Sequence, residues 1–425
     1  MRFKNWKIWL KSKPWILKWF IILVLLRPII DNLYFLKNIS PFLSPLYIVG
    51  VLTPILVIFA LAKRPKPIHS KLDTYFKIWS AFLLIGIFFV ILFDPLTLNS
   101  FEYLLKLSIP IYIYFFARIF IQNKQDLDGI LTSFLYSGIF VAAILLYELF
   151  FGAIRIVESR GMERIQGSFG DVVSYGIYLS FCFLIVTYFY FSRKGELPKI
   201  KRIRTVIIVG ILCVLTLLNI HHVASYTIFL GILLLFLVFN FRANKGAAFV
   251  LSFLLFITFY LFAQPIIEEK ITPLLETDIE VYEGEQDSGR LMHGRMGRWT
   301  AMMETFTNEN IFAQCFGYPT TLKYSYHYVG VGSHNDFVRI LFLSGYFGLF
   351  YYLVVLVIFY NRAKKLFIAT KYLAFGTLGV LMLYSISIVP TYYPPFMYVV
   401  MSVFAFVALP NKPHQQQHQT LNIKP

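Results

Sequence analysis

Apolar runs recur along the whole chain and are separated by shorter polar segments. Each run is about 20 residues long, which lets an α-helix cross a hydrocarbon core of about 30 Å. The alternating apolar and polar pattern of a membrane β-barrel is missing from the sequence, and backbone polar groups in lipid must be paired within the segment itself. The pattern therefore predicts an all-α polytopic membrane protein with about twelve transmembrane helices. The expected spans are residues 15–30, 41–62, 77–93, 101–121, 130–151, 172–192, 205–220, 223–241, 246–264, 334–360, 372–389 and 395–409.

Composition supports a single membrane domain. The chain has 425 residues, of which 58% are hydrophobic and 14% charged, whereas about a quarter of a soluble globular chain is charged. Length alone would suggest about two or three soluble domains. We expect instead one membrane domain over residues 1–410. Residues 411–425 are polar and low in complexity, which predicts a disordered cytoplasmic tail.

Basic residues occupy alternate connectors between the apolar runs. The net charge of +17 would point to nucleic acid in a soluble protein. Here, however, Lys and Arg gather in the N-terminal segment and near residues 63–71, 193–204 and 362–371, while 94–100 has none. This asymmetry sets membrane orientation. We expect both termini in the cytoplasm, no nucleic-acid partner, and a first span that is retained because no cleavage site follows it.

Residues suited to metal binding are scattered. The three cysteines have no disulfide or zinc spacing, and we expect no metal. Asp126-Leu127-Asp128 resembles the metal motif of nucleotide-sugar transferases, but it falls in a cytoplasmic connector. The carboxylates between residues 276 and 287 have two open interpretations, a solvated acidic loop or a site for a divalent ion or acceptor sugar.

Two outer connectors are longer than the others, 152–171 and a loop of roughly 70 residues at 265–333 between the ninth and tenth spans. We expect the second to fold against the outer membrane face. Both are rich in arginine, which the positive-inside rule disfavours at that face. Guanidinium groups bind phosphate bidentately and keep their charge, so the pattern predicts an anionic ligand. The arginines are Arg155, Arg160, Arg164, Arg290, Arg295 and Arg298.

His334 stands where the long loop meets the tenth span, at the height of lipid headgroups. An imidazole titrates near neutral pH and can take a proton from a hydroxyl group. Asn335 either orients this histidine or caps the helix that follows, and the alternative is that His334 is simply an interfacial residue. His222, in a short outer turn, has the same two interpretations. Arg27 and Asp31 lie near an outer span end, where such groups are functional or extend to headgroups.

Three segments, taken in order, resemble the O-antigen ligase and O-antigen polymerase superfamily. Residues 163–169, read ERIQGSF, are similar to its Arg-x-x-Gly stretch. Residues 295–299, read RMGRW, followed by 316–318, read FGY, are similar to its Arg-x-x-x-Trp and Gly-x-Gly run. Residues 333–337, read SHNDF, followed by 344–349, read SGYFGL, are similar to its His-Asn and Gly-x-x-Gly-Leu run. The core of the match covers about 205–355, loop 265–333 included.

The sequence departs from the family at two places. The turn between the seventh and eighth spans reads NIHHVAS over 219–225 and lacks the Ser-Arg that the family often has there. This puts one phosphate contact in doubt, unless His222 compensates. The Gly-x-Gly run appears as Gly317-Tyr318-Pro319, so its second glycine is missing.

The resemblance implies a GT-C-like glycosyltransferase in a bacterial inner membrane. It transfers a glycan from undecaprenyl pyrophosphate to a hydroxyl of lipid A core, for a ligase, or of a second glycan chain, for a polymerase. No cofactor or metal is implied. On physical grounds Arg295, Arg164 and Arg298 hold the diphosphate, His334 receives the acceptor proton, and grooves between spans hold the lipid tail. The other expected substrate contacts are Asn335, His222, Arg339, Arg160 and Trp299.

Two other functions stay open at the level of sequence. A transporter or lipid-linked glycan flippase tends to have repeated halves, broken helices and charges near the bilayer midplane. The central parts of the expected spans here are nearly free of charge. A non-catalytic scaffold of an envelope assembly is the third interpretation, and it does not require His334 for activity.

Overall fold

The computed structural model describes residues 3–33, 35–36, 39–40, 43–63, 68–93, 98–159, 162–220, 222–241, 279–288, 291–317 and 334–410. Several sequence expectations lie outside these residues. They are the span at 246–264, the site residue Arg160, much of the loop 265–333 and the tail 411–425.

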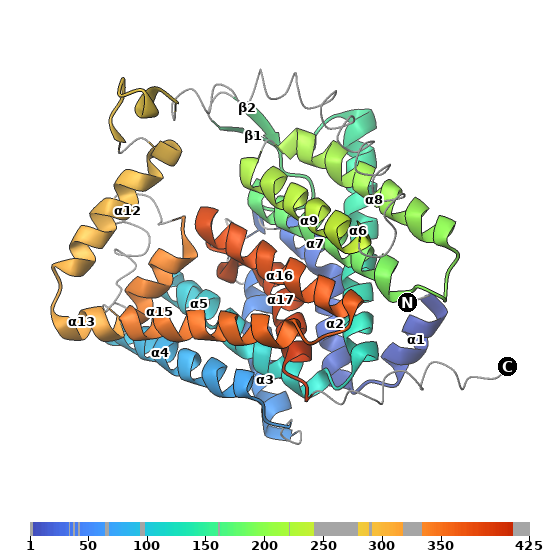
Figure 1. The fold of residues 1–425 in the computed structure, drawn as a ribbon, viewed down its shortest axis with the longest axis horizontal. Helices are drawn as coiled ribbons and strands as arrows, with labels where there is room; N and C mark the ends of the chain where they lie inside the picture. Colours follow the sequence, from blue (N-terminus) through green and yellow to red (C-terminus); the bar gives the residue numbers. More distant parts are fainter. Residues whose placement is uncertain are drawn as a thin grey trace.

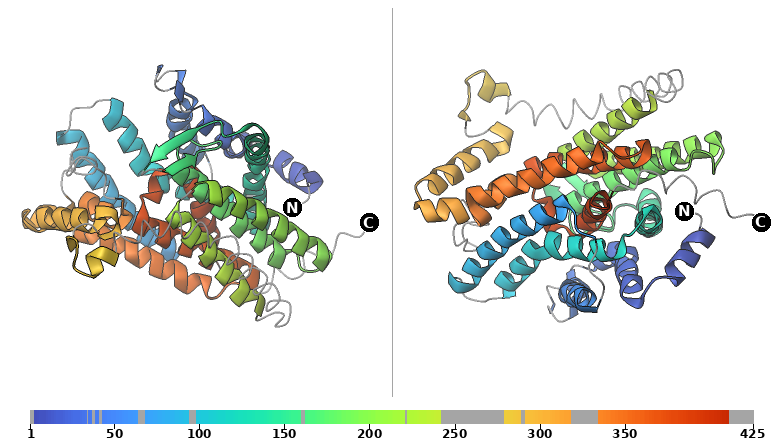
Figure 2. Two further views of the ribbon diagram at one scale, coloured as in Figure 1. Left: turned by 90° about the horizontal axis from the view of Figure 1, so that it is seen from above. Right: turned by 60° about the horizontal axis from the view of Figure 1, so that its bottom comes forward.

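Helices form nearly all of the described chain, with one short β-hairpin (Figure 1). The elements are α1 (Phe3–Lys11), α2 (Trp15–Asn32), α3 (Pro45–Lys63), α4 (Lys71–Phe93), α5 (Leu98–Phe120), α6 (Lys124–Phe151), β1 (Ile156–Ser159), β2 (Met162–Ile165), α7 (Val172–Ser192), α8 (Lys199–Ile220), α9 (Val223–Phe241), α12 (Leu291–Thr307), α13 (Ile311–Phe316), α15 (Asp336–Ala363), α16 (Ile368–Ser387), η5 (Pro390–Tyr392) and α17 (Pro394–Val407). Helices α1 and α12 lie on opposite sides of the molecule (Figures 1 and 2).

Seven of the described helices are long and apolar enough to cross a membrane, namely α3, α6, α7, α8, α9, α15 and α16. This confirms the class of protein that the apolar runs predict, a helical multi-pass membrane protein. Helices α2, α4, α5 and α17 coincide with four further expected spans. The total of about twelve spans stays a prediction.

Helix α7 is the centre of the bundle. Every residue from Tyr175 to Tyr190 is buried, and the helix contacts α6, α8, α9, α16 and α17. A helix that is apolar all round belongs in an interior. Polar side chains connect it to neighbouring helices, because Thr187 Oγ1 lies 2.7 Å from Tyr372 Oη of α16 and Tyr178 Oη lies 2.6 Å from Ser137 Oγ of α6.

Ion pairs tie the helices together at the expected cytoplasmic side. Arg118 of α5 is 2% exposed and donates from Nε to Asp73 Oδ1 of α4 at 2.7 Å. Tyr114 Oη donates to the same oxygen at 2.7 Å. Breaking a buried pair by removing one partner leaves an uncompensated charge. The pair therefore fixes how α4 and α5 pack against each other.

Asp126 and Asp128 have structural partners as well. Asp126 pairs with Lys13 and accepts from Trp9 Nε1 at 3.1 Å, which docks α1 on α6. Asp128 accepts from Lys124 at 3.0 Å. The described residues contain no group of three or more His, Cys, Asp or Glu that could hold a metal ion. The similarity of 126–128 to a metal motif is therefore explained by helix packing.

Helix α15 is broken at Gly345, where φ is 65° and ψ is −171°. The first part, 336–344, turns sharply away from the long second part, 346–363 (Figure 1). A Cβ on Gly345 would lie 2.3 Å from the carbonyl carbon and oxygen of Cys315, at the end of α13. Glycine is required at such a position because a side chain disfavours positive φ and would meet the backbone. The break is therefore filled by α13.

Two more glycines complete this junction. A Cβ on Gly317, which has φ of +99°, would lie 2.3 Å from the carbonyl oxygen of Leu343. A Cβ on Gly86 of α4 would lie 2.0 Å from the same oxygen. Backbones of α4, α13 and α15 thus meet without intervening side chains. We call this contact the glycine junction, formed by Gly86, Gly317 and Gly345.

Replacing Gly345 by alanine should destabilise the fold by at least about 2 kcal/mol, because the left-handed backbone costs a side chain about 1–2 kcal/mol and the new Cβ meets Cys315. Thermal unfolding of the purified protein, followed by tryptophan fluorescence, measures this loss. The matched control is Gly379→Ala in α16, where nothing lies within 4 Å of the new Cβ. It should be neutral or more stable, by up to about 1 kcal/mol. Equal melting temperatures for the two variants would contradict the importance of the junction.

Candidate functional site

The first outer connector contains a β-hairpin that carries Arg164. Strands β1 and β2 are antiparallel, and Arg164 stands opposite Val157. Directly after β2, Gly167 has φ of +56°, and a Cβ there would lie 2.4 Å from the Tyr175 ring. Phe169 is fully buried beside that ring, with centroids 5.3 Å apart. The hairpin is thereby fixed to the start of α7, and the expected Arg-x-x-Gly spacing acquires a physical reason.

Arg155 has a structural partner. Its Nη2 donates to the carbonyl oxygen of Asn32 at 2.7 Å, and its guanidinium lies 5.5 Å from the centroid of the Phe35 ring. A cation is favourable at a helix C-terminus because of the unsatisfied carbonyl groups there. This arginine therefore anchors the hairpin to the end of α2, and the arginine-rich composition of the loop does not by itself mean that every arginine binds an anion.

Helix α12 carries Arg295, Arg298 and Trp299, which are all partly buried. Its last turns pack on the first part of α15. Met302 and Phe306 form a small apolar cluster with Leu341 and Phe342. The Phe306 and Phe342 ring centroids are 5.3 Å apart. Because Arg295 and Arg298 are three residues apart, they share one side of the helix.

His334 has an unusual backbone conformation. Its φ is 47°, and it is the one non-glycine residue with positive φ in the described part of the chain. Its side chain is exposed. Left-handed non-glycine residues are uncommon and gather at functional sites, where the surrounding structure holds the strain. Asn335 follows as the N-cap of α15, with Oδ1 accepting from the backbone N–H of Phe337 at 2.9 Å and of Val338 at 3.2 Å.

Arg339 lies in the interior, in the first turn of α15. It is 5% exposed and donates from Nε to Asp336 Oδ1 at 2.8 Å and from Nη2 to Thr391 Oγ1. Thr391 in turn donates to Asp336 Oδ1 at 2.9 Å. This triad ties the start of α15 to η5. In this structure Arg339 supports the helix that carries His334, whereas the sequence led us to expect a substrate contact.

His222 begins a chain of polar groups that runs into the bundle. Its Nδ1 lies 2.7 Å from Ser225 Oγ, and Ser225 Oγ lies 3.1 Å from Tyr384 Oη. Tyr384 Oη lies 3.4 Å from Ser180 Oγ of α7. A hydrogen bond at one ring nitrogen sets the tautomer and orientation of an imidazole. The chain therefore fixes His222 at the head of α9.

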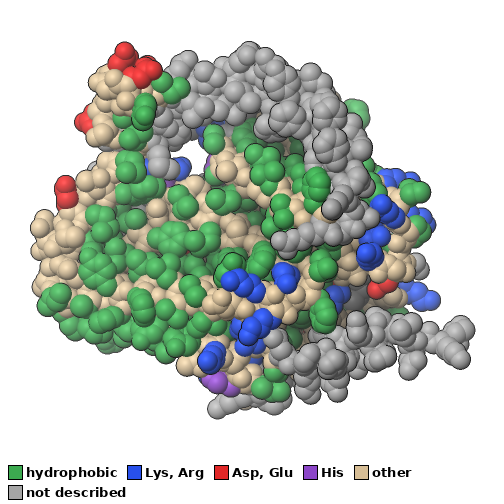
Figure 3. Space-filling model, in the orientation of Figure 1, with side chains coloured by type: hydrophobic (Ala, Val, Ile, Leu, Met, Phe, Trp, Pro, Cys, Tyr) green, Lys and Arg blue, Asp and Glu red, His purple; other side chains and the backbone are tan. Residues whose placement is uncertain are grey.

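The elements that carry the expected site residues gather at one side of the molecule. They are β2, the turn between α8 and α9, α12 and the start of α15 (Figure 1). Strand β2 also contacts α8. In the same orientation, the surface is hollowed in this region, with Lys or Arg and His side chains visible at the margin (Figure 3). We call this the outer hollow. Most other Lys and Arg side chains on this face lie in its lower and right parts (Figure 3).

A second charged pair lies in α2. Arg27 Nη2 and Asp31 Oδ1 are 2.8 Å apart, and Arg27 Nε donates to Asp31 Oδ2 at 3.1 Å. The spacing of four between Arg27 and Asp31 is the sequence signal that identifies the pair.

Asp171 is a further buried carboxylate, at the nearby start of α7. Burial raises the pKa of Asp171 above its ordinary value, and its hydrogen bonds with Ser174 act in the opposite direction.

No protein-family model matches the chain, and no curated protein matches it. The resemblance to the O-antigen ligase and polymerase superfamily therefore rests on the sequence motifs alone.

Replacing Thr391 by valine should destabilise the protein by about 1–3 kcal/mol, because it removes an acceptor from a buried guanidinium. Thermal unfolding measures the loss, and Thr391→Ser should recover most of it. Thr227→Val is the matched control, since Thr227 is an exposed helical threonine whose hydroxyl donates to the carbonyl oxygen of Val223 in the same helix. That change should stay within about 0.5 kcal/mol. Equal losses for Thr391→Val and Thr227→Val would show that the triad does not anchor α15.

Proposed function

We propose that this protein is a metal-independent membrane glycosyltransferase that moves a glycan from undecaprenyl pyrophosphate to an acceptor hydroxyl at the outer face of a bacterial inner membrane. The observation that carries the proposal is the outer hollow. Four separate chain segments, which hold Arg164, His222, Arg295 and His334, gather at this side of the molecule (Figure 1). The same proposal includes a total of about twelve spans, a GT-C-like arrangement and a cytoplasmic location for both termini.

The chemistry follows from the charges. Arg295, Arg298 and Arg164 bind the diphosphate oxygens of the donor. His334 takes the proton of the acceptor hydroxyl, whose oxygen attacks the anomeric carbon. The bond between that carbon and the phosphate oxygen breaks, and the electron pair leaves with the lipid diphosphate. Guanidinium groups stabilise this growing negative charge, as a divalent cation does in other transferases. The polyprenyl tail lies between helices.

The acceptor defines two versions of the proposal. A ligase uses lipid A core, and a polymerase uses the end of a second lipid-linked glycan. We favour the ligase, and the chemistry at His334 is the same in both. The strained backbone at His334 and the triad beneath it support a base that is held in a fixed place, which a proton transfer requires.

A transporter or flippase is the second candidate, and the broken helix α15 favours it. Broken helices in transporters line a water-filled pathway or a midplane binding site. The break at Gly345 is instead packed against Cys315 of α13. Non-helical backbone at membrane depth is tolerated when it is buried in protein, so the break here is satisfied by packing and does not need a transport pathway.

His334→Ala should lower glycan transfer by about 100- to 10,000-fold, the contribution of a positioned general base. The test uses a strain that lacks the gene, complemented with each variant, in which glycan on the lipid carrier and glycan on the acceptor are both measured. His69→Ala is the matched control, because His69 is an exposed histidine ahead of α4, where it bonds to Thr74. It should keep full activity.

The two glycan pools distinguish the candidate functions. Loss of a ligase leaves polymer on the lipid carrier, and loss of a polymerase leaves single repeats on the anchor. Loss of a flippase leaves lipid-linked glycan at the inner face. A scaffold keeps its function when His334 is alanine. Unchanged pools in the strain without the gene would contradict the whole proposal.

Arg295→Gln should lower kcat/KM by about 100-fold, and Arg295→Lys should recover only part of it because lysine cannot bind bidentately. An excess of EDTA should leave the wild-type rate unchanged. The measurement is transfer from a purified lipid-linked glycan by the reconstituted protein, with Arg204→Gln, an exposed arginine of α8, as control. A rate that falls with EDTA, or equal losses at Arg204 and Arg295, would count against diphosphate binding by Arg295.

A further inference from the structure

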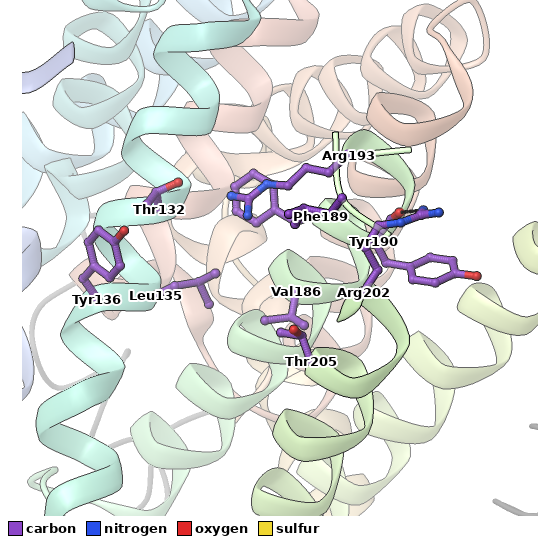
Figure 4. A pocket seen from close by; sticks show the side chains of 10 residues that line it. Thr132, Leu135, Tyr136, Val186, Phe189, Tyr190, Arg193, Arg202 and Thr205 are labelled. Atoms are coloured by element: carbon purple, nitrogen blue, oxygen red, sulfur yellow. Dashed lines mark hydrogen bonds between the residues drawn. The ribbon is translucent and has the colours of Figure 1, made fainter. Parts of the chain in front are cut away.

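A cavity lies between α6, α7 and α8. It has a volume of about 170 Å³. Leu135, Val186 and Phe189 form part of an apolar wall, and Arg193 and Arg202 also line it (Figure 4). The cavity adjoins the basic connector 193–204, which is on the expected cytoplasmic side.

Arg193 is the C-cap of α7, and its side chain extends over the cavity toward Thr132 of α6 (Figure 4). Its guanidinium lies 4.3 Å from the centroid of the Phe189 ring. Burial lowers the pKa of Arg193, and the carboxylate of Glu196 acts in the opposite direction. No carboxylate within the described ranges forms an ion pair with it. The cavity therefore holds a partly buried positive charge that can accept an anion.

Arg202, the second arginine of the cavity, has one donor without an acceptor. Its Nη1 donates to the carbonyl oxygen of Tyr190 at 2.6 Å, and its guanidinium lies 5.1 Å from the centroid of that ring. Its Nε is buried and has no hydrogen-bond partner among the residues that the structure describes. Buried donors almost always have an acceptor in proteins. A ligand oxygen near this connector would provide one.

Helix α1 places the cavity at the membrane surface. It is a short amphipathic helix with Lys4, Lys7 and Lys11 exposed, a pattern typical of helices that lie in the headgroup region. Trp6 Nε1 donates to Ser133 Oγ of α6 at 2.8 Å, and the Trp6 ring lies against Tyr136, with centroids 5.2 Å apart. Tyr136 also lines the cavity, so α1 and the cavity lie at the same height along α6.

Further along α6 and α8 the exposed side chains are apolar. Ile139, four residues after Leu135, is 69% exposed, and Ile208, three residues after Thr205, is 49% exposed. Residues at these spacings lie on the same side of a helix. The cavity therefore continues into a surface that faces lipid tails, with its charge at one end and apolar residues at the other.

We propose that this cavity binds an anionic glycerophospholipid of the cytoplasmic leaflet, with the phosphate at Arg193 and the upper part of one acyl chain along Leu135 and Val186. Basic cavities between transmembrane helices at this face suit anionic headgroups. Pockets that enclose whole small molecules have volumes of about 300–1,000 Å³, so this smaller cavity takes only part of its ligand. A lipid fits because the rest of it stays in the bilayer. The site is independent of the glycan-transfer proposal.

The test uses the full-length protein in micelles, titrated with phosphatidylglycerol or phosphatidylcholine, with bound lipid counted by native mass spectrometry. Phosphatidylglycerol should bind more tightly. Arg193→Gln should weaken it by about tenfold, the contribution of one charge-assisted hydrogen bond. The matched control is Arg204→Gln, an exposed arginine on the same connector and helix that does not line the cavity, and its affinity should not change.

A second variant leaves the charges intact. Thr205→Trp should fill the cavity from its exposed edge and abolish preferential binding of phosphatidylglycerol, even if Arg193→Gln fails to fold. Three results with the two lipids and the variants would overturn the proposal. They are equal affinity for the two lipids, equal weakening by Arg193→Gln and Arg204→Gln, and retention of full binding in Thr205→Trp. Inorganic phosphate that displaces the lipid completely would also overturn it, because it would indicate a site for a free anion.

Discussion

The contact on which the candidate site depends is the glycine junction, where the backbones of α4 and α13 meet the broken turn of α15. Because φ at Gly345 is positive, the first part of α15 leaves the direction of the long second part. That change of direction determines where His334 and Asn335 stand. The same junction holds α13, and through it α12, whose Phe306 packs on Phe342. One backbone contact thus places both the imidazole and two of the guanidinium groups.

The sequence predicted the class of the fold because a helix that crosses lipid needs a continuous apolar run, and such runs can be found directly in the sequence. An apolar run of sufficient length must be a helix in lipid, so helices occur at the expected spans throughout the described residues. The break in α15 has no such signal. Residues 336–363 read as one apolar run, and a glycine inside a run is compatible with a helix. Only the contact with Cys315 explains why the helix breaks at Gly345.

The candidate site also has some features that the sequence can predict and others that it cannot. The N-cap role of Asn335 and the pairing of Asp336 with Arg339 follow from local spacing, which sequence can show. The burial of Arg339 could not be foreseen, because its partner Thr391 lies 52 residues away. The hairpin at 156–165 was expected only as a connector, since its strands are too short for an alternating pattern. Arg155 illustrates the limit of composition, because its contact with Asn32 serves the fold.

Side-chain-free contact between α13 and α15 also determines how the outer hollow can open. Where two backbones touch directly, no side chains lie between them that could change rotamer and absorb a movement. Helices α12 and α13 and the first part of α15 therefore form one rigid unit, which is one jaw of the outer hollow. The hairpin and the turn between α8 and α9 form the facing jaw. Gly167 anchors the hairpin to α7, and the hydrogen bond between Ser225 and Tyr384 anchors the start of α9 to α16. In the proposed function, the glycan enters between these two jaws. Arg295 and Arg298 thus belong to the same jaw as His334, whereas Arg164 and His222 belong to the other jaw.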